Sequence, residues 1–227
     1  MKKFILFTIL FCSFNLICAA QKPKTPVKKV EPKTIEPQSI PEISDADWKN
    51  LTDVLKAEDW NKSAALAAQY LQNLKADNEK KHLAQLRYIY LYALAGKILA
   101  ASSVKVPIET DSLWKELDEA VGSFIGKEFV LPPRRFLPEC KDVLNYICPV
   151  KNNDRLLRVT ATNDEGTMIH SFDYVSFDEK ISLDKFADTE TFLGGRLKRA
   201  EFNEDMSKLW VMRLIFEKGF VRVVVSK

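Results

Sequence analysis

The chain has 227 residues, of which 46% are hydrophobic and 29% are charged, and its formal net charge is +3 at pH 7. That length is enough for one or two small domains with buried cores. The 34 basic residues are nearly balanced by 31 acidic ones, so the chain carries no strong electrostatic field. The composition therefore excludes a dedicated nucleic-acid binder and a protein that holds an anionic membrane by charge alone.

The first twenty residues predict a secretory signal. Two lysines precede an apolar run from Phe4 to Ile17, and two alanines close the segment, which is the order of regions in such signals. The apolar run is shorter than the ~20 residues that span a bilayer, and the chain after it turns polar and proline-rich. We therefore expect cleavage after Ala20 and no transmembrane segment in the mature chain. Lipid attachment at Cys18 is the alternative, although Asn15 stands where that motif has a Leu-like residue.

Residues 21–43 predict an extended linker rich in proline and lysine. They hold five of the ten prolines of the chain. Proline fixes its own φ and biases the residue before it toward extended conformations, so neither a helix nor a central strand can form here. We interpret this segment as a semi-rigid spacer, with a docking peptide for a proline-binding groove as the alternative.

Residues 44–125 predict a helical domain. Ser44 and Asp47 form a start signal that resembles a capping box, and apolar residues then recur at helical spacing. We expect helices near residues 45–56, 59–74, 78–101 and 113–124. The third has so broad an apolar stripe that we expect it to be buried on more than one side.

Trp48, Leu51, Ala64 and Ala68 occur in the order typical of tetratricopeptide helix pairs. The first two helices therefore resemble such a pair, and the resemblance covers roughly residues 45–100. One and a half pairs are fewer than the three or so units that a self-supporting solenoid needs, so we expect a small helical bundle docked on another element. The alanines have a simpler explanation too, because small residues let two helices approach closely whatever they bind.

The hydrophobic period changes from that of helices to that of strands between Gly122 and Gly126, so residues 126–227 predict a β-rich domain. A hairpin is expected at Asn163–Gly166 and a tight turn at Lys218 and Gly219. The strand before that turn is apolar on both faces, which indicates a central position. The expected strands are residues 128–131, 155–162, 167–177, 191–202, 208–218 and 220–226.

Three strands, a short helical insert at residues 182–187 and two or three more strands resemble the order of an OB-type barrel. The expected fold class is therefore α+β: a small helical bundle followed by a mainly antiparallel β domain. Within that class we favour an OB-like barrel over a β-sandwich.

The stretch GGRLKRAEF, residues 194–202, predicts a strand with a bend at its two glycines. Alternation along a strand would place Arg196 and Lys198 on one face and Leu197 and Arg199 on the other. A basic face for an anionic polymer, a glycan or a carboxylate-bearing peptide is one interpretation, to which Arg213 and Arg222 could contribute. A solvated surface balanced by nearby acidic residues is the other. The candidate binding residues are Arg134, Arg135, Arg155, Arg158, Arg196 and Lys198.

Catalytic and metal-binding patterns are missing from the sequence. His82 and His170 are the only histidines, and there is no HExxH, paired CxxC or glycine-rich phosphate loop. We therefore assign no catalytic residue, metal ligand or cofactor. A carboxylate pair remains the alternative for acid-base chemistry, drawn from Asp164, Glu165, Asp173 and Asp178.

Cys140 and Cys148 are the only cysteines after the predicted signal. In an exported protein such a pair predicts a local disulfide, with two reduced core residues as the alternative.

These features predict an exported, non-catalytic interaction or binding module of the cell envelope, either periplasmic or secreted. We expect its partner to be another envelope or secreted protein. The alternative is a ligand-binding or hydrolytic envelope protein that acts on glycans or peptides through the basic face of the β domain.

Overall fold

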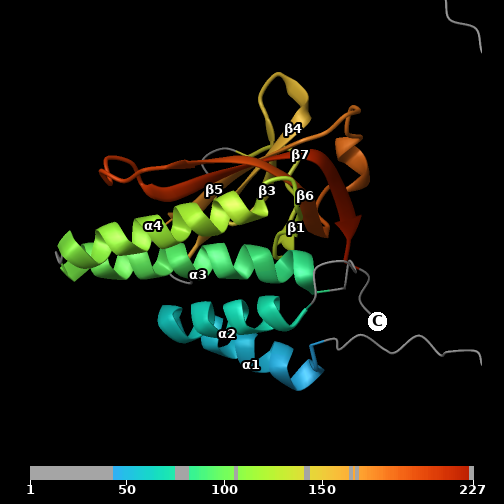
Figure 1. The fold of residues 1–227 in the computed structure, drawn as a ribbon. Coiled ribbons are helices and arrows are strands. Elements are labelled where there is room, and N and C mark those ends of the chain that lie inside the picture. Colours follow the sequence, from blue (N-terminus) through green and yellow to red (C-terminus); the bar gives the residue numbers. More distant parts are fainter. Residues whose placement is uncertain are drawn as a thin grey trace, which may run out of the picture. The chain divides into compact units, whose positions relative to one another are not determined.

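The computed structural model describes residues 43–74, 82–104, 107–140, 144–163, 166 and 169–224. They belong to one compact unit that extends from Ile40 to Lys227. Four helices come first and seven strands follow, so the expected α+β layout is confirmed (Figure 1). The elements are α1 (Asp45–Lys56), α2 (Trp60–Asn73), α3 (Leu83–Val104), α4 (Pro107–Phe124), β1 (Glu128–Val130), β2 (Arg134–Arg135), β3 (Ile147–Val150), β4 (Asn153–Thr162), β5 (Ile169–Ser176), a short 3-10 helix η1 (Leu183–Lys185), β6 (Glu190–Phe202) and β7 (Trp210–Val223).

Helices α1 and α2 form an antiparallel hairpin. The Ser44 hydroxyl accepts a hydrogen bond from the Asp47 amide at 3.1 Å and caps α1, and the Asp59 carboxylate caps α2 in the same way. At the far end of the hairpin, the Tyr70 hydroxyl of α2 donates to the carboxylate of Asp47 at 3.3 Å. The end of α2 therefore lies beside the beginning of α1.

Helix α3 is covered on two sides, as its broad apolar stripe predicts. Leu86 and Ile89 join a core cluster with residues of α1 and α2. Leu91, Leu94 and Ile98 join a second, larger core cluster, which includes most of the buried residues of the sheet. Figure 1 shows α3 between the α1–α2 hairpin and the sheet, with α4 beside it.

Helix α4 begins six residues earlier than the sequence predicts. It starts at Pro107, whereas the sequence predicts a helix over residues 113–124. Proline is compatible with the first position of a helix, because the amide hydrogen that it lacks has no helical partner there. The residue that suggests a break is therefore the one that starts the helix.

The sheet is open and mixed. Its strand order is β1-β6-β7-β5-β4-β3, with β2 also paired to β6, and only the β5–β7 pair is parallel. The expectation of a closed barrel is wrong, because β1, β2 and β3 contain only two to four residues each and offer too little strand to join the edges. One isolated bridge, between Phe136 and Ile147, lies between these edges. The resemblance to OB-type domains itself stays a prediction, as does that to tetratricopeptide pairs.

Strand β7 lies between β5 and β6, which confirms the central position expected for residues 208–218. The tight turn expected at Lys218 and Gly219 is wrong, because β7 continues through both residues. Gly194 of β6 is paired with Phe220 of β7, and Arg196 with Glu217. Two residues along β6 therefore match three along β7, and the extra residue of β7 forms a bulge. Lys218, within this bulge, has a φ of 52°. Turn-forming residues thus bend the longest strand instead of ending it.

A disulfide joins Cys140 to Cys148 across a Cα–Cα distance of 5.7 Å and confirms the expected pairing. Cys148 belongs to the edge strand β3 and is almost fully buried. In the chain-entropy description, closing so short a loop stabilises the folded state by about 2.5 kcal/mol. The bond ties the segment before β3 to the edge of the sheet.

Gly96 allows α2 to approach α3 closely. A Cβ atom at Gly96 would lie 2.4 Å from the indole ring of Trp60, whereas one at Gly122 in α4 would have no heavy atom within 4 Å. We expect Gly96→Ala to lower the free energy of unfolding by about 1–3 kcal/mol, because the ring must move. Gly122→Ala should raise it by about 0.5–1 kcal/mol through helix propensity alone. Urea unfolding of both variants measures this; equal stabilisation by the two alanines would contradict the close approach.

Candidate binding face

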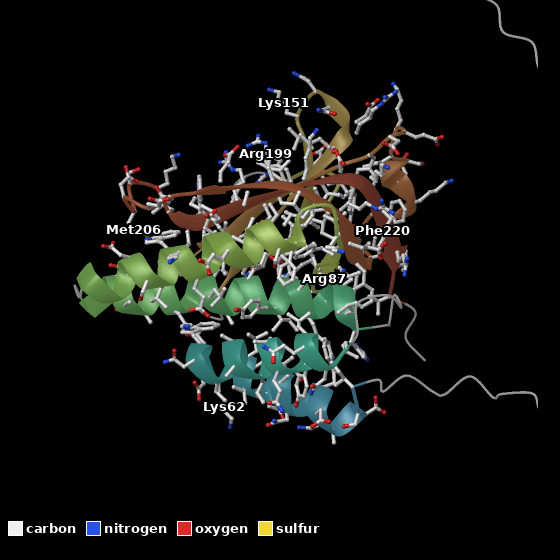
Figure 2. The ribbon with its side chains drawn as sticks, in the orientation of Figure 1. Lys62, Arg87, Lys151, Arg199, Met206 and Phe220 are labelled. Carbon is white, nitrogen blue, oxygen red and sulfur yellow. A yellow bond between two sulfur atoms is a disulfide. The ribbon has the colours of Figure 1, made fainter. Side chains whose placement is uncertain are left out.

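The side of the sheet that faces away from α3 and α4 carries half-buried rings and guanidinium groups. Side chains alternate along β5: Ser171, Asp173 and Val175 are fully buried, whereas Phe172 and Tyr174 are only partly buried. Asp173 contacts Tyr88 of α3, so the buried set faces the helices and the aromatic pair faces away from them. Figure 2 shows Arg199 on this outer side and Arg87 on the helix side.

Arg213 of β7 is the centre of this outer face. Its guanidinium carbon lies 5.5 Å from the ring centroids of both Phe172 and Tyr174, and 4.7 Å from that of Trp210. Each such cation–π contact contributes about 0.5–1 kcal/mol at a partly exposed site. The side chain keeps 27% of its surface exposed. Rings and cation therefore hold one another in place at the surface.

Glu201 of β6 is shared by two arginines. Its carboxylate accepts a hydrogen bond from Nη1 of Arg213 at 3.1 Å and another from Nη1 of Arg199. The hydrogen bond from Arg199 is the main cause that lowers the pKa of Glu201. On the other side of the rings, the guanidinium of Arg158 lies 5.9 Å from the centroid of Phe172. We call Arg158, Phe172, Tyr174, Arg199 and Arg213 the arginine patch.

Three of the six predicted binding residues lie on this outer face. Arg158 belongs to the arginine patch, and Arg196 and Lys198 lie beside it on β6, where Lys198 pairs with Glu217 at 3.5 Å. Arg196 is exposed and is in register with Glu217. These three residues share a surface, although they come from two strands that are not neighbours.

The other predicted residues do not converge on it. Arg134 and Arg135 form β2, which pairs with the beginning of β6 at Thr191 and Glu190, and Arg135 pairs with Asp188 at 3.0 Å. Arg155 is exposed at the beginning of β4, and alternation places it on the side of the buried Leu157. The single basic face that the sequence suggested is therefore only half present.

Arg199 was expected to share the face of Leu197, and that expectation is wrong. Leu197 is fully buried, whereas Arg199 is exposed and pairs with Glu201. Leu197 is paired with Phe216 of β7, and Arg199 with the next residue along, Ile215. The extra residue of β6 forms a bulge, which moves the side chain of Arg199 to the opposite face from Leu197. Of the residues that the candidate list missed, Phe172 and Tyr174 did have a sequence signal, namely their alternation with the small or polar Ser171 and Asp173.

A buried polar cluster lies on the other face of β5. Asp173 is fully buried and accepts hydrogen bonds from the Tyr88 hydroxyl at 2.9 Å, from the Leu214 amide at 3.1 Å and from the Ser171 hydroxyl. Burial raises the pKa of Asp173 to about 7, although these hydrogen bonds oppose the rise. The same burial, with the neighbouring Asp173, raises the pKa of Tyr88 well above its usual value. This cluster links α3, β5 and β7.

His170 is the second buried titratable group of β5. Its ring stacks on Tyr92 with centroids 4.3 Å apart and lies 4.7 Å from the ring of Trp60. Burial lowers the pKa of His170 to about 4, opposed by a contact with the carbonyl of Tyr92. His82 lies elsewhere, stacked on Trp48 at 4.2 Å. The two histidines therefore do not form a common site.

The alternative acid-base residues are not assembled either. Asp173 is sealed in the core and Asp178 is exposed. Asp164 and Glu165 lie outside the described residues. In the part of the chain that is described, no group of three or more His, Cys, Asp or Glu side chains is placed to hold a metal ion.

Three clefts lie away from the arginine patch. The first, of about 720 Å³, is acidic and lies between α4 and the loop before β7; the second, of about 570 Å³, lies beside η1; the third, of about 650 Å³, lies beside Trp60. None of the three is lined by a residue of the patch. The patch is therefore a surface and not the wall of one of these clefts.

Comparison of the chain with family models, with curated proteins and with solved structures gives no match. Within the described residues, no helix is both long enough and apolar enough to cross a membrane.

Asp173 and His170 oppose each other in the pH dependence of stability. The folded state raises the pKa of Asp173 from 3.8 to about 7, so its contribution is complete below pH 3.8 and is lost as the pH rises toward 7. The folded state lowers the pKa of His170 from 6.5 to about 4, so its contribution grows as the pH rises from 4 to 6.5. Over that interval the two slopes have opposite signs.

We expect Asp173→Asn to make the free energy of unfolding rise between about pH 4.5 and pH 7, by on the order of 3 kcal/mol, because only the slope of His170 remains. His170→Gln should make it fall over the same range. Urea midpoints of both variants and of the unchanged chain measure this. Parallel pH profiles for all three proteins would show that neither residue has the expected linkage.

Proposed function

We propose that the protein is an exported, non-catalytic binding module of the cell envelope, and that the arginine patch contacts its partner. The observation that carries this proposal is the cluster of Arg213 with the partly exposed rings of Phe172 and Tyr174, packed on the buried Trp210. Arginine and aromatic residues are the types that dominate binding energy at protein interfaces. Here their contacts with one another are already formed without a partner, which lowers the entropic cost of association.

The titratable groups support a binding role over a catalytic one. Asp173 and His170 have strongly shifted pKa values, and both are buried, at 0% and 1% exposure. A catalytic acid or base must reach its substrate within hydrogen-bond distance. These two groups serve the fold, and the residues that reach solvent on the outer face are suited to recognition.

The proposal that the protein is exported rests on two independent features. The N-terminal segment has the layout of a secretory signal. The disulfide between Cys140 and Cys148 is of a kind that persists in oxidising compartments such as the periplasm and the cell exterior.

Protein recovered from the cell envelope should begin at Gln21, because cleavage is expected after Ala20. Intact-mass measurement and N-terminal sequencing check this. A lipid-modified Cys18 at the N-terminus would replace the cleaved form with an anchored one, and an uncleaved Met1 would contradict export by this route.

A photo-reactive residue at Tyr174 should form an adduct with the partner in intact cells, because this ring is partly exposed within the arginine patch. The matched control places the same p-benzoylphenylalanine at Tyr70, a partly exposed tyrosine of α2. Adducts at Tyr174 and none at Tyr70, detected by gel shift and mass spectrometry, are the expected result. Adducts at Tyr70 alone would transfer the binding role to the helical hairpin.

The second cleft favours an alternative, in which the protein binds or hydrolyses a small glycan or peptide. Its volume of about 570 Å³ falls within the range of small-molecule sites, and Phe177, Phe186 and Phe220 line it together with Lys185 and Lys218. If the protein has this function, a small glycan or peptide binds its folded state and raises the melting temperature of the protein.

A further inference from the structure

One row of residues crosses the arginine patch from end to end. Arg158 of β4 is in register with Tyr174 of β5, Tyr174 with Ile215 of β7, and Ile215 with Arg199 of β6. Adjacent strands lie about 4.8 Å apart, so the Cα atoms of Arg158 and Arg199 are roughly 14 Å apart. Two guanidinium groups thus flank a centre made of a tyrosine ring and an isoleucine side chain.

The patch carries an excess of positive charge. Arg199 and Arg213 share one carboxylate, that of Glu201. Arg158 forms no ion pair with any described residue, and its one observed contact is with the ring of Phe172. Three guanidinium groups therefore face one carboxylate, on a chain whose total charge is close to zero. This local excess favours an acidic partner.

The rings of the patch are poorly available for stacking on a sugar. The guanidinium of Arg213 lies over Phe172 and Tyr174, and that of Arg158 also lies over Phe172. A partner therefore meets the N–H groups of the arginines, together with the parts of Tyr174 and Ile215 that stay exposed. Guanidinium groups present these donors in a planar fork that matches a carboxylate.

None of the three clefts described above is lined by a residue of the patch. Small-molecule sites bury 70–90% or more of their ligand, whereas protein partners bind open surfaces. An extended polypeptide can cross four strands and contact both ends of the row.

We infer that the arginine patch binds an extended acidic segment of a partner protein, in which two carboxylates flank an apolar residue. Successive residues of an extended chain advance about 3.4 Å, so carboxylates four residues apart match the roughly 14 Å between Arg158 and Arg199. Residues at positions one, three and five also point to the same side, which brings the middle side chain over Tyr174 and Ile215. This inference rests on the proposed function.

The test uses the chain from Gln21 and a fluorescein-labelled peptide with the core Glu-Ser-Leu-Ser-Glu, titrated by fluorescence anisotropy near physiological salt. We expect saturable binding that is lost when both glutamates are replaced by glutamine. Arg158→Gln and Arg199→Gln should each weaken it roughly five- to tenfold, the size expected for one charge-assisted contact at a surface. Arg158→Lys should weaken it less, because it keeps the charge and loses the fork.

Arg155→Gln is the matched control, because it removes the same charge from the same strand outside the patch. It should change the affinity by less than about twofold, since a charge away from the contact acts only through a screened field. Urea midpoints equal to that of the unchanged chain show that each variant is folded.

Three outcomes overturn the inference. They are an absence of saturable binding up to millimolar peptide, an equal loss in Arg155→Gln and Arg158→Gln, and a sulfated glycan that binds through Arg158 and Arg199 more tightly than the peptide does. Adducts at Tyr174 with a glycan or a non-acidic protein would leave the proposed function standing while this inference fails. If the peptide does not bind and no adduct forms at Tyr174, both this inference and the proposed function are wrong.

Discussion

Helix α3 sets the constraint on which the rest of the structure depends. Nearly every position from Leu83 to Leu99 is apolar, and the helix therefore needs cover on more than one side. The α1–α2 hairpin covers one side and the sheet covers the other, so neither layer has a complete core of its own. The bundle and the sheet thus form one compact unit, and the change of period near residue 125 marks a change of secondary structure within it.

This arrangement leaves one face of the sheet without helices, and its residues differ accordingly. On the covered face, Asp173 is satisfied by hydrogen bonds from a helix, a neighbouring strand and its own strand. On the open face, Arg213 is held by ring faces and one shared carboxylate. Asp173 and Arg213 are both ionisable. Burial restricts Asp173 to a structural role, whereas partial exposure allows Arg213 to contact a partner.

The sequence predicted what depends on local patterns. Helix caps such as Ser44, the apolar breadth of α3, the central position of β7 and the pair Cys140–Cys148 all follow from spacing and residue type. The predictions from the sequence were wrong where one extra residue in a strand forms a bulge. Lys218 and Gly219 have the composition of a turn, and only pairing with β6 shows that they form a bulge. The position of Arg199 depended on a second bulge, and the contact of Arg213 with β5 depended on a parallel register that no local pattern encodes.

The strand order has a consequence for how the chain is made. β3 pairs with β4 and β4 with β5, while β1 and β2 both pair with β6, and β7 lies between the two groups in the strand order. It is also the last of the seven to be synthesised. Until residues 210–223 are made, the inner edges of β5 and β6 have no strand to pair with, and the bridge between Phe136 and Ile147 is the pairing left between the two groups among the described residues. Such late, long-range closure is slow. The chain therefore has most need of protection by chaperones in the interval before β7 is made, when the inner edges of β5 and β6 are unpaired.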